Sequence, residues 1–499
     1  MRKILLGTTA VVGAALLAPS VASAQEAPTV RIGGYFQAYF GNTIQTGSAA
    51  TNVSMNTIGG GEAGQSSPFQ GNVGGNTGAV APTGTTTGLP AGSIGVANTS
   101  QNQQGSARLG HNDFSSDAEI HVFVNGKTAN GLSYGAVLEM AFNQQEGSVR
   151  NSGRRAVNDK TTAFMDEYYA FISSPTLGQI RFGDEDGPMG GLMNAGFITN
   201  FGSGGVYGYW ENFVHRPNRT TTSPGGLGDN TKLIYLSPQV FGFDVGVSWA
   251  FNEGSGEDVG CLNSFASINC DRVYAVTGPG NNSRSHALPG RTNELQAMLR
   301  WRGNIAGVGI AASAGMMSSQ VIRNIDLTGA ITKTLQSPQV YQVGLQATWQ
   351  GLTVGANYMW GNTSFFYIPV SRGVKPMEQW FLGASYTFGP FTIGANGFWG
   401  SYGQLPGAAG ANGAATFTGV GAPMQKRYAF SVGANYRLAP GMDIVVEWTQ
   451  HTTTIAGTTP AAPLGFSQQG LGACSATQVN NCSNKATAQV FMIGTRLAF

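Results

Sequence analysis

Charged side chains are scarce in this chain of 499 residues. Aspartate, glutamate, lysine and arginine together make up 10% of it, whereas soluble domains have about 25%. The shortage excludes a typical cytosolic enzyme, a coiled coil and a charged disordered chain. Glycine, in contrast, is abundant at 74 residues, about twice the usual share. Length alone allows about three domains, but one strand pattern runs through the chain and indicates a single large domain.

Long apolar runs are also missing, apart from one at the N-terminus. Residues 1–3 carry positive charge, residues 4–18 are mostly apolar, and residues 22–24 form a small-residue cleavage site. These three parts define a secretory signal peptide over residues 1–24, so the mature chain is expected to begin at Gln25. The rest of the chain has nothing near the ~18 apolar residues of a spanning helix. A membrane protein with this sequence must cross with strands.

The balance of charge gives no sign of a basic surface. The whole chain carries a net charge of +2. Arg2 and Lys3 leave with the signal peptide, so the mature chain has as many basic as acidic residues. Binding to nucleic acid needs a basic face, and nucleic acid is therefore not expected as a partner.

The apolar residues of the mature chain alternate with small or polar ones. In the last segment, one phase holds Phe491, Ile493 and Leu497, while the other holds Gly494 and Arg496. A period of two indicates a β-strand with two different faces. Similar segments of about ten residues recur, which is the length of a tilted transmembrane strand. Their aromatic residues gather at the segment ends, as in the two interfacial girdles of a lipid-facing sheet. These residues are Trp349, Trp360, Phe388, Phe391, Trp399 and Phe499.

The connections between these segments alternate between short turns and long stretches rich in Gly, Asn, Ser and Thr. One strand at residues 30–41, seven hairpins and one C-terminal strand make sixteen, an even number that closes with both termini on one side. The expected fold is all-β, a transmembrane antiparallel β-barrel over residues 25–499. The inward face of segment 161–173 stays unassigned because it holds both Asp166 and Glu167. The long connections cover about residues 42–116, 143–162, 187–229, 252–293, 319–338, 362–377, 402–426 and 453–485.

Four short motifs, taken in order, resemble one protein family. They are Val30-Arg31-Ile32-Gly33-Gly34-Tyr35-Phe36, Gln179-Ile180-Arg181-Phe182-Gly183-Asp184, Lys232-Leu233-Ile234-Tyr235-Leu236-Ser237-Pro238 and Arg496-Leu497-Ala498-Phe499. With the signal peptide, they resemble the general diffusion porins of Gram-negative outer membranes, most like the alphaproteobacterial type. The resemblance implies a sixteen-stranded homotrimer in outer-membrane lipid and lipopolysaccharide. It also implies a third loop that folds inward and narrows a water-filled pore.

The constriction is expected in residues 187–229 and in the acidic run before them. Asp184, Glu185 and Asp186 begin this region, and Glu211 lies within it. Charges at the narrowest point of a pore bias ion selectivity, and low-dielectric walls focus their field. Two alternatives stay open: bases near strand ends only solvate the mouth, and Asp184 and Asp186 form a solvated turn or a loose calcium site. The polar strand phases that would face the acids carry Arg31, Arg181, Lys232, Arg300, Arg302, Arg437 and Arg496.

Cysteine is rare, with four residues in two close pairs. Cys261 and Cys270 share one long connection, and Cys474 and Cys482 share another. An even number in a secreted chain suggests disulfides, and pairing within each connection is the simplest of the three connectivities. A metal site is disfavoured, because its ligands would come from separate loops and no CxxC is present.

Three functions remain open for this sequence. The first is a non-specific porin for ions and small hydrophilic solutes, the second a substrate-selective channel for sugars or anions, and the third a secreted soluble β-protein or adhesin. An enzyme is not expected, because the GxSxG match at residues 131–135 and the GxGxxG match at residues 59–64 lack their strand and helix context. Glu119 and His121 share a lumen face, but one such pair does not make a metal or catalytic site.

Overall fold

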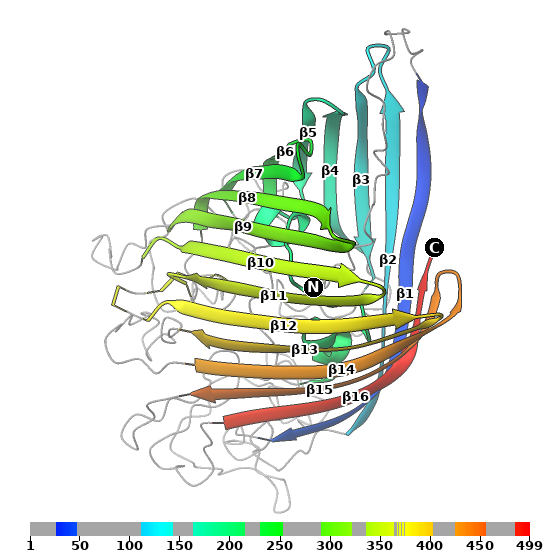
Figure 1. The fold of residues 1–499 in the computed structure, drawn as a ribbon, viewed down its shortest axis with the longest axis vertical. Coiled ribbons are helices and arrows are strands. Elements are labelled where there is room, and N and C mark those ends of the chain that lie inside the picture. Colours follow the sequence, from blue (N-terminus) through cyan, green and yellow to red (C-terminus); the bar gives the residue numbers. More distant parts are fainter. Residues whose placement is uncertain are drawn as a thin grey trace, which may run out of the picture.

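The fold is a closed barrel of sixteen antiparallel strands. Each strand is hydrogen-bonded to its neighbours in sequence, and the first pairs with the last (Figure 1). The predicted all-β barrel and its number of strands are thereby confirmed. The strands are β1 (Glu26–Thr46), β2 (Asn112–Lys127), β3 (Ser133–Ala141), β4 (Phe164–Ser174), β5 (Gly178–Asp184), β6 (Thr231–Leu236), β7 (Phe243–Asn252), β8 (Arg291–Ile305), β9 (Val308–Val321), β10 (Gln339–Trp349), β11 (Leu352–Gly361), β12 (Met377–Phe388), β13 (Phe391–Tyr402), β14 (Gln425–Ala439), β15 (Met442–Ile455) and β16 (Lys485–Ala498).

The computed structural model describes the strands, the short turns and one long connection. No helix in this part of the chain is both long enough and apolar enough to cross a membrane. The signal peptide, most of residues 42–116 and all four cysteines lie outside the described residues, so the cleavage site and the disulfides stay predictions. The described residues are 26–46, 111–142, 163–214, 230–252, 291–321, 336–363, 367, 369–370, 372–373, 375–402, 425–455 and 485–499.

The two faces of each strand differ in the way that the alternation predicts. On β12, Trp380 and Leu382 are 44% and 60% exposed on the outside, whereas Gln379 and Ser385 are both 2% exposed on the inside. A charge on the lipid face of a barrel costs about 2–4 kcal/mol at the midplane. Apolar residues therefore take the outward positions, and polar ones are left to the inside.

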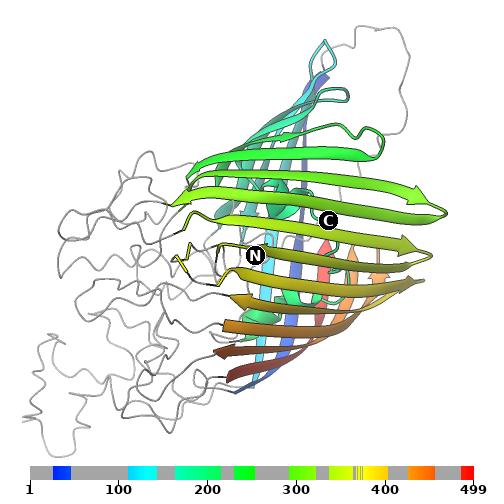
Figure 2. The same ribbon diagram turned by 60° about the vertical axis from the view of Figure 1, so that its left-hand side comes forward.

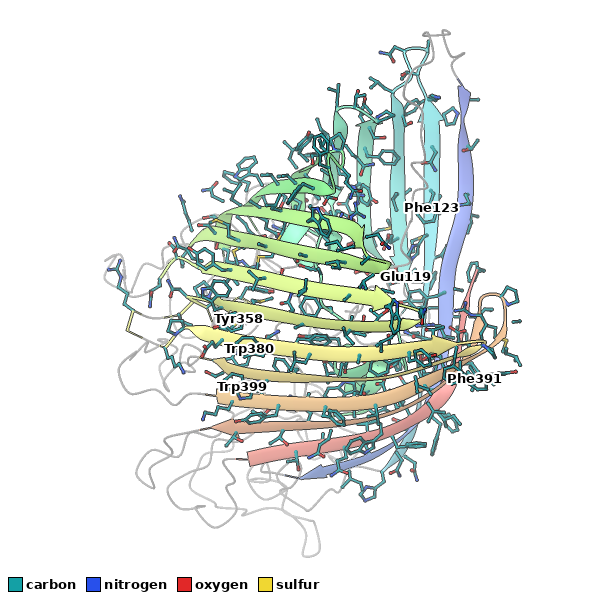
Figure 3. All side chains as sticks on the ribbon, in the orientation of Figure 1. Glu119, Phe123, Tyr358, Trp380, Phe391 and Trp399 are labelled. Carbon is teal, nitrogen blue, oxygen red and sulfur yellow. The ribbon has the colours of Figure 1, made fainter. Side chains whose placement is uncertain are left out.

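Aromatic side chains form two bands on the outside. Figure 3 shows Tyr358, Trp380 and Trp399 close to one end of β11–β13, and Phe391 at the other end. The ring centroids of Tyr358 and Trp380 are 4.1 Å apart, and those of Phe391 and Tyr436 are 5.0 Å apart. Aromatic rings collect in this way at the two interfaces of a bilayer.

Tight turns connect the strands at one end of the barrel, the turn end; the opposite end is the loop end. Ala306-Gly307 and Gln350-Gly351 both have positive φ at their two residues, with values of 52° and 83°, and 45° and 87°. Such two-residue turns have the twist that neighbouring antiparallel strands need. These turns are two of the short connections that the alternation of short and long connections predicts.

A β-bulge explains why the inward face of β4 could not be assigned from the sequence. The register with β3 pairs Glu139 with Glu167 and then Met140 with Met165, so Asp166 is an extra residue. An extra residue in one strand shifts its alternation by one position. Glu167 is 3% exposed and Met165 is 38% exposed, which shows that the phase changes between them.

Candidate functional site

One long connection folds back into the barrel. It follows β5 and comprises residues 185–214, the inserted segment. The segment contains a π-helical turn, η3 (Pro188–Leu192), and two 3-10 turns, η4 (Gly205–Tyr207) and η5 (Tyr209–Phe213). Figures 1 and 2 show these turns inside the ring of strands. The chain itself therefore fills part of the barrel interior.

Side chains of the inner wall hold the backbone of the inserted segment. Gln296 accepts a hydrogen bond from the backbone N–H of Met189 at 3.0 Å. Asn396 accepts from the N–H of Val206 and donates to the carbonyl of Ile198, both at 2.9 Å. A buried irregular backbone needs such partners for its N–H and C=O groups. Further wall residues that bond to this backbone include Ser313 on β9, Asn357 on β11, Asn435 on β14 and Glu447 on β15.

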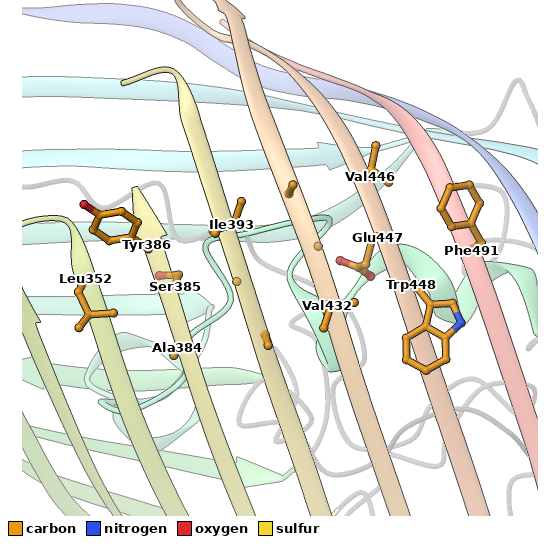
Figure 4. Close-up of a pocket in the computed structure, with 14 residues that line it drawn as sticks. Leu352, Ala384, Ser385, Tyr386, Ile393, Val432, Val446, Glu447, Trp448 and Phe491 are labelled. Atoms are coloured by element: carbon orange, nitrogen blue, oxygen red, sulfur yellow. The ribbon is translucent and has the colours of Figure 1, made fainter. Parts of the chain in front are cut away.

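Glu447 on β15 is a charged anchor for the segment. It accepts hydrogen bonds from the backbone N–H of Ser203 at 2.7 Å, the hydroxyl of Ser203 at 3.0 Å and the N–H of Gly205 at 2.9 Å. Figure 4 shows the Glu447 side chain beside the inserted segment. Burying a carboxylate is costly unless hydrogen bonds satisfy it. Three donors from the segment do so here, and bonds to a charged acceptor are about twice as strong as neutral ones.

Glycines on the inner wall let the segment lie against the strands. A Cβ atom at Gly344 on β10 would lie 2.0 Å from the carbonyl oxygen of Ala195, and one at Gly394 on β13 would lie 2.2 Å from the ring of Phe201. Both distances are below the 3.0 Å that real Cβ atoms keep. Part of the high glycine content therefore serves this close approach. Gly355, Gly383 and Gly433 face the segment in the same way.

Aromatic rings hold the end of the segment near the loop end of the barrel. The ring of Tyr209 lies 4.8 Å from that of Tyr39 on β1, and its hydroxyl lies 2.9 Å from the Ser115 hydroxyl on β2. The buried Trp210 ring lies 5.6 Å from the His451 ring. Burial raises the pKa of Tyr209 to about 12, so this phenol is neutral at physiological pH.

The acidic run at residues 184–186 is buried at the start of the segment, with at most 5% of each residue exposed. Arg181 Nη1 lies 2.5 Å from Glu185 Oε1. The ammonium group of Lys232 donates to the backbone carbonyl of Glu185. The structure therefore brings two of the expected wall bases to one of the expected acids.

The other expected acids do not form one ring with Glu185. Asp184 accepts a hydrogen bond from the Thr231 hydroxyl beside β5. Glu211 lies at the far end of the inserted segment, in η5. The acids thus occupy the two ends of the segment. A calcium ion at Asp184 and Asp186 stays a prediction.

The remaining expected bases lie toward the turn end. Arg300 Nη2 is 2.6 Å from Asp244 Oδ2, and Arg300 also donates to the carbonyl of Leu192 in the inserted segment at 3.1 Å. A role in ion selectivity stays a prediction for each of these bases. The other contacts of this set join Arg302 to Asp244, Arg437 to Asp443, Arg496 to Asp443, and Arg31 to the ring of Phe123.

A second charged group lies on the opposite part of the wall. The acidic wall comprises Asp117, Glu119 and His121 on β2 and Glu139 on β3. Tyr35 on β1 donates to Glu119 at 3.1 Å and to Asp117 at 3.3 Å. The side chains of Glu119, His121 and Glu139 are 11%, 18% and 14% exposed. Sequence reasoning placed Glu119 and His121 on one lumen face but set the pair aside, and it did not link them to Asp117 or Glu139.

Sequence reasoning also missed the amides that hold the inserted segment. Asn357, Gln379, Asn396 and Asn435 were recognised only as members of the polar phase of their strands. A usable signal was their type, because an amide in mid-strand offers both a donor and an acceptor to a nearby backbone.

Residues 91–456 match the model of a family described as Gram-negative porin. No curated protein matches the chain. Similar solved structures include an anion-selective porin from Comamonas acidovorans (11% identity, TM-score 0.46), the trimer form of OmpT from Vibrio cholerae (12%, 0.45) and a mutant of the Rh. blastica porin (14%, 0.41). They cover 95%, 95% and 94% of this chain, and 100% of each of theirs.

Proposed function

The chain belongs to the Gram-negative porin family, and we propose that ions and small hydrophilic solutes cross it along the acidic wall. Membership makes the protein a diffusion channel of the outer membrane. A channel, rather than a secreted soluble β-protein or adhesin, is therefore the function of the barrel. The family does not favour a sugar- or anion-selective channel either.

The proposed path depends on how much of the inner wall the inserted segment covers. Its hydrogen bonds to the wall reach β5, β6, β8, β9 and β11–β15. Gln296 and Asn396 beneath it are 0% and 2% exposed. It meets β2 through Tyr209, near the loop end. The side chains of His121 and Glu139 are 18% and 14% exposed. This difference in exposure is the observation that carries the proposal, because the acidic wall is more accessible to water than the amides beneath the inserted segment.

The charges along this path favour cations. Residues 112–126, 133–141 and 164–174, which make up nearly all of β2–β4, contain no arginine or lysine. The inserted segment contains none either. Acidic groups in a narrow opening attract cations, and the low-dielectric walls strengthen that attraction. We therefore expect a porin with a weak preference for cations.

Reversal potentials in asymmetric potassium chloride test both the path and the preference. The purified protein in a planar bilayer is expected to form ohmic channels that pass potassium better than chloride. The triple variant Asp117→Asn, Glu119→Gln, Glu139→Gln removes three negative charges from the path, so its reversal potential should move toward the anion side.

A matched control removes one charge from the same strand at the loop end, away from the three carboxylates. Asp113 lies on β2 near the loop end, exposed, where its carboxylate caps the backbone N–H of Phe114. Asp113→Asn should leave the reversal potential close to that of the unchanged protein. A triple variant no different from this control would refute the proposed path, and channels without any conductance would refute the function itself.

We also propose that the inserted segment narrows the passage. Its position inside the barrel supports this role, and it reduces the open section to the side of β2–β4. In this proposal Asp184, Glu185 and Asp186 stand at the start of the constriction and Glu211 at its end. The bases Arg181 and Lys232 fix the start of the segment instead of facing it across the pore.

We propose assembly as a homotrimer in outer-membrane lipid with lipopolysaccharide on the outer leaflet. The family resemblance supports this assembly, and the Vibrio cholerae OmpT structure is described as a trimer form. Light scattering of the protein in detergent should give three times the chain mass. A single-chain mass in mild detergent would contradict the assembly.

We infer that the protein performs no catalysis of its own. Diffusion through an open channel requires neither a nucleophile nor a cofactor.

A further inference from the structure

Three side chains of the acidic wall converge on one point of the channel surface. His121 Nε2 lies 2.7 Å from Glu119 Oε1, and His121 Nδ1 lies 3.7 Å from Glu139 Oε1. One donor atom from each of the three residues lies within 4.8 Å of the other two. Figure 3 marks Glu119 on β2.

The strand register makes this convergence a property of the sheet. Glu119 and His121 are two residues apart on β2, and side chains at that spacing share a face. His121 lies directly opposite Glu139 in the pairing of β2 with β3. Directly opposite residues have their Cβ atoms about 4.5–5.5 Å apart. Two neighbouring strands of a closed barrel therefore hold the three groups together without any contribution from a loop.

His121 and Glu119 form a close pair, with Nε2 2.7 Å from Oε1. A metal ion bound here would replace the proton between the two groups, because the ligands of a metal must be deprotonated or neutral and binding releases their protons.

We propose that Glu119, His121 and Glu139 bind a transition-metal dication of the zinc type on the channel wall. One imidazole and two carboxylates suit such an ion, whereas calcium and magnesium prefer oxygen ligands alone. Zinc holds these donors at about 2.0–2.2 Å in a tetrahedron, so two donors on one ion lie about 3.4 Å apart. The three donor atoms lie within 4.8 Å of one another, so side-chain rotation must bring them closer when the ion binds.

The surroundings fit an ion that is held from one side. The partial exposure of His121 and Glu139 leaves the remaining coordination positions to water of the channel. Tyr35 donates a hydrogen bond to Glu119 Oε2. A partner of this kind orients a ligand and raises its affinity for the metal. The site requires only the fold of β1–β4, so it stands whether or not solutes take the path proposed above.

Calorimetric titration of the untagged mature protein with zinc chloride tests the site. We expect one zinc ion per chain, and a loss of affinity of about tenfold or more in His121→Asn and in Glu139→Gln, because losing a ligand costs at least as much as losing an outer partner. Cobalt(II) should give visible absorption bands with the unchanged protein, and these bands should weaken in His121→Asn.

His111→Asn is the matched control, because His111 lies next to β2 and bonds to the Thr43 carbonyl at the loop end. Its zinc affinity should equal that of the unchanged protein. Heat-dependent migration on gels verifies that each variant is a folded barrel, and Glu119→Gln replaces any variant that fails this check. Equal zinc affinity in His121→Asn and in the unchanged protein, or no binding at millimolar zinc, would overturn the proposal.

Discussion

Two parts of the inner wall share one strand pattern and differ in their chemistry. From β8 to β15 the inward positions hold amides such as Asn357 and Asn396 and glycines such as Gly394, and the inserted segment covers them. On β2 and β3 they hold carboxylates and His121, which remain partly exposed. The alternation decides only which side chains point inward. What lies opposite them, backbone or water, decides which residue types are suitable.

The difference follows from the cost of burying polar groups. An amide can satisfy one N–H and one C=O of an irregular backbone without burying a charge. A buried charge costs far more unless several donors surround it. Facing water, the same charge is cheap and adds to the field inside the channel. Glu447 is a charge on the covered wall, and its three donors from the inserted segment show what that position requires.

The largest effect is expected from removing this charged anchor. Glu447→Ala leaves the N–H groups of Ser203 and Gly205 buried without their acceptor, at about 1–3 kcal/mol for each group. The inserted segment should then detach from β15. We expect a lower free energy of unfolding in denaturant and noisier single-channel currents. Glu447→Gln keeps one acceptor oxygen in place, so its free energy of unfolding and its current noise should lie between those of Glu447→Ala and of the unchanged protein. A Glu447→Ala channel as quiet and as stable as the unchanged one would contradict the role of the anchor.

A smaller effect is expected from replacing a glycine against which the segment packs. Gly344→Ala places a methyl group 2.0 Å from the Ala195 carbonyl oxygen, so the segment must move from the wall toward the barrel axis. Crowding of this kind costs about 1–3 kcal/mol, and the single-channel conductance should fall. Gly397→Ala on β13 is the control, because its nearest neighbour is 3.5 Å away and the new methyl group fits. Equal conductance in both variants would show that the segment does not rest on β10.

The strand count could be predicted because lipid imposes one rule on every strand. An outward residue must be apolar wherever it lies, so the period of two recurs along the whole chain and the aromatic ends mark its limits. The bulge at Asp166 interrupts that rule for one residue, and the inward face of β4 could be read only from its pairing with β3.

The site was harder to predict because its partners are far apart in sequence. Val206 and Asn396 are 190 residues apart, and Ser203 and Glu447 are 244 residues apart. No local pattern links residues at such distances. The acidic run at residues 184–186 attracted attention because it is contiguous, whereas the acidic wall is assembled from two strands and became visible only with their register.

The smallest effect is expected at the turn end, where water surrounds the charges. The side chain of Arg437 is 66% exposed and lies 3.1 Å from Asp443, and ion pairs of this kind contribute about 0–1 kcal/mol. Arg437→Gln should therefore change neither stability nor reversal potential measurably. Arg300→Gln should destabilise more, because Arg300 is only 17% exposed and also holds the Leu192 carbonyl of the inserted segment. If Arg437→Gln shifted the reversal potential as far as the acidic-wall triple variant does, selectivity would be set at the turn end, and the contrast between the two walls would not explain it.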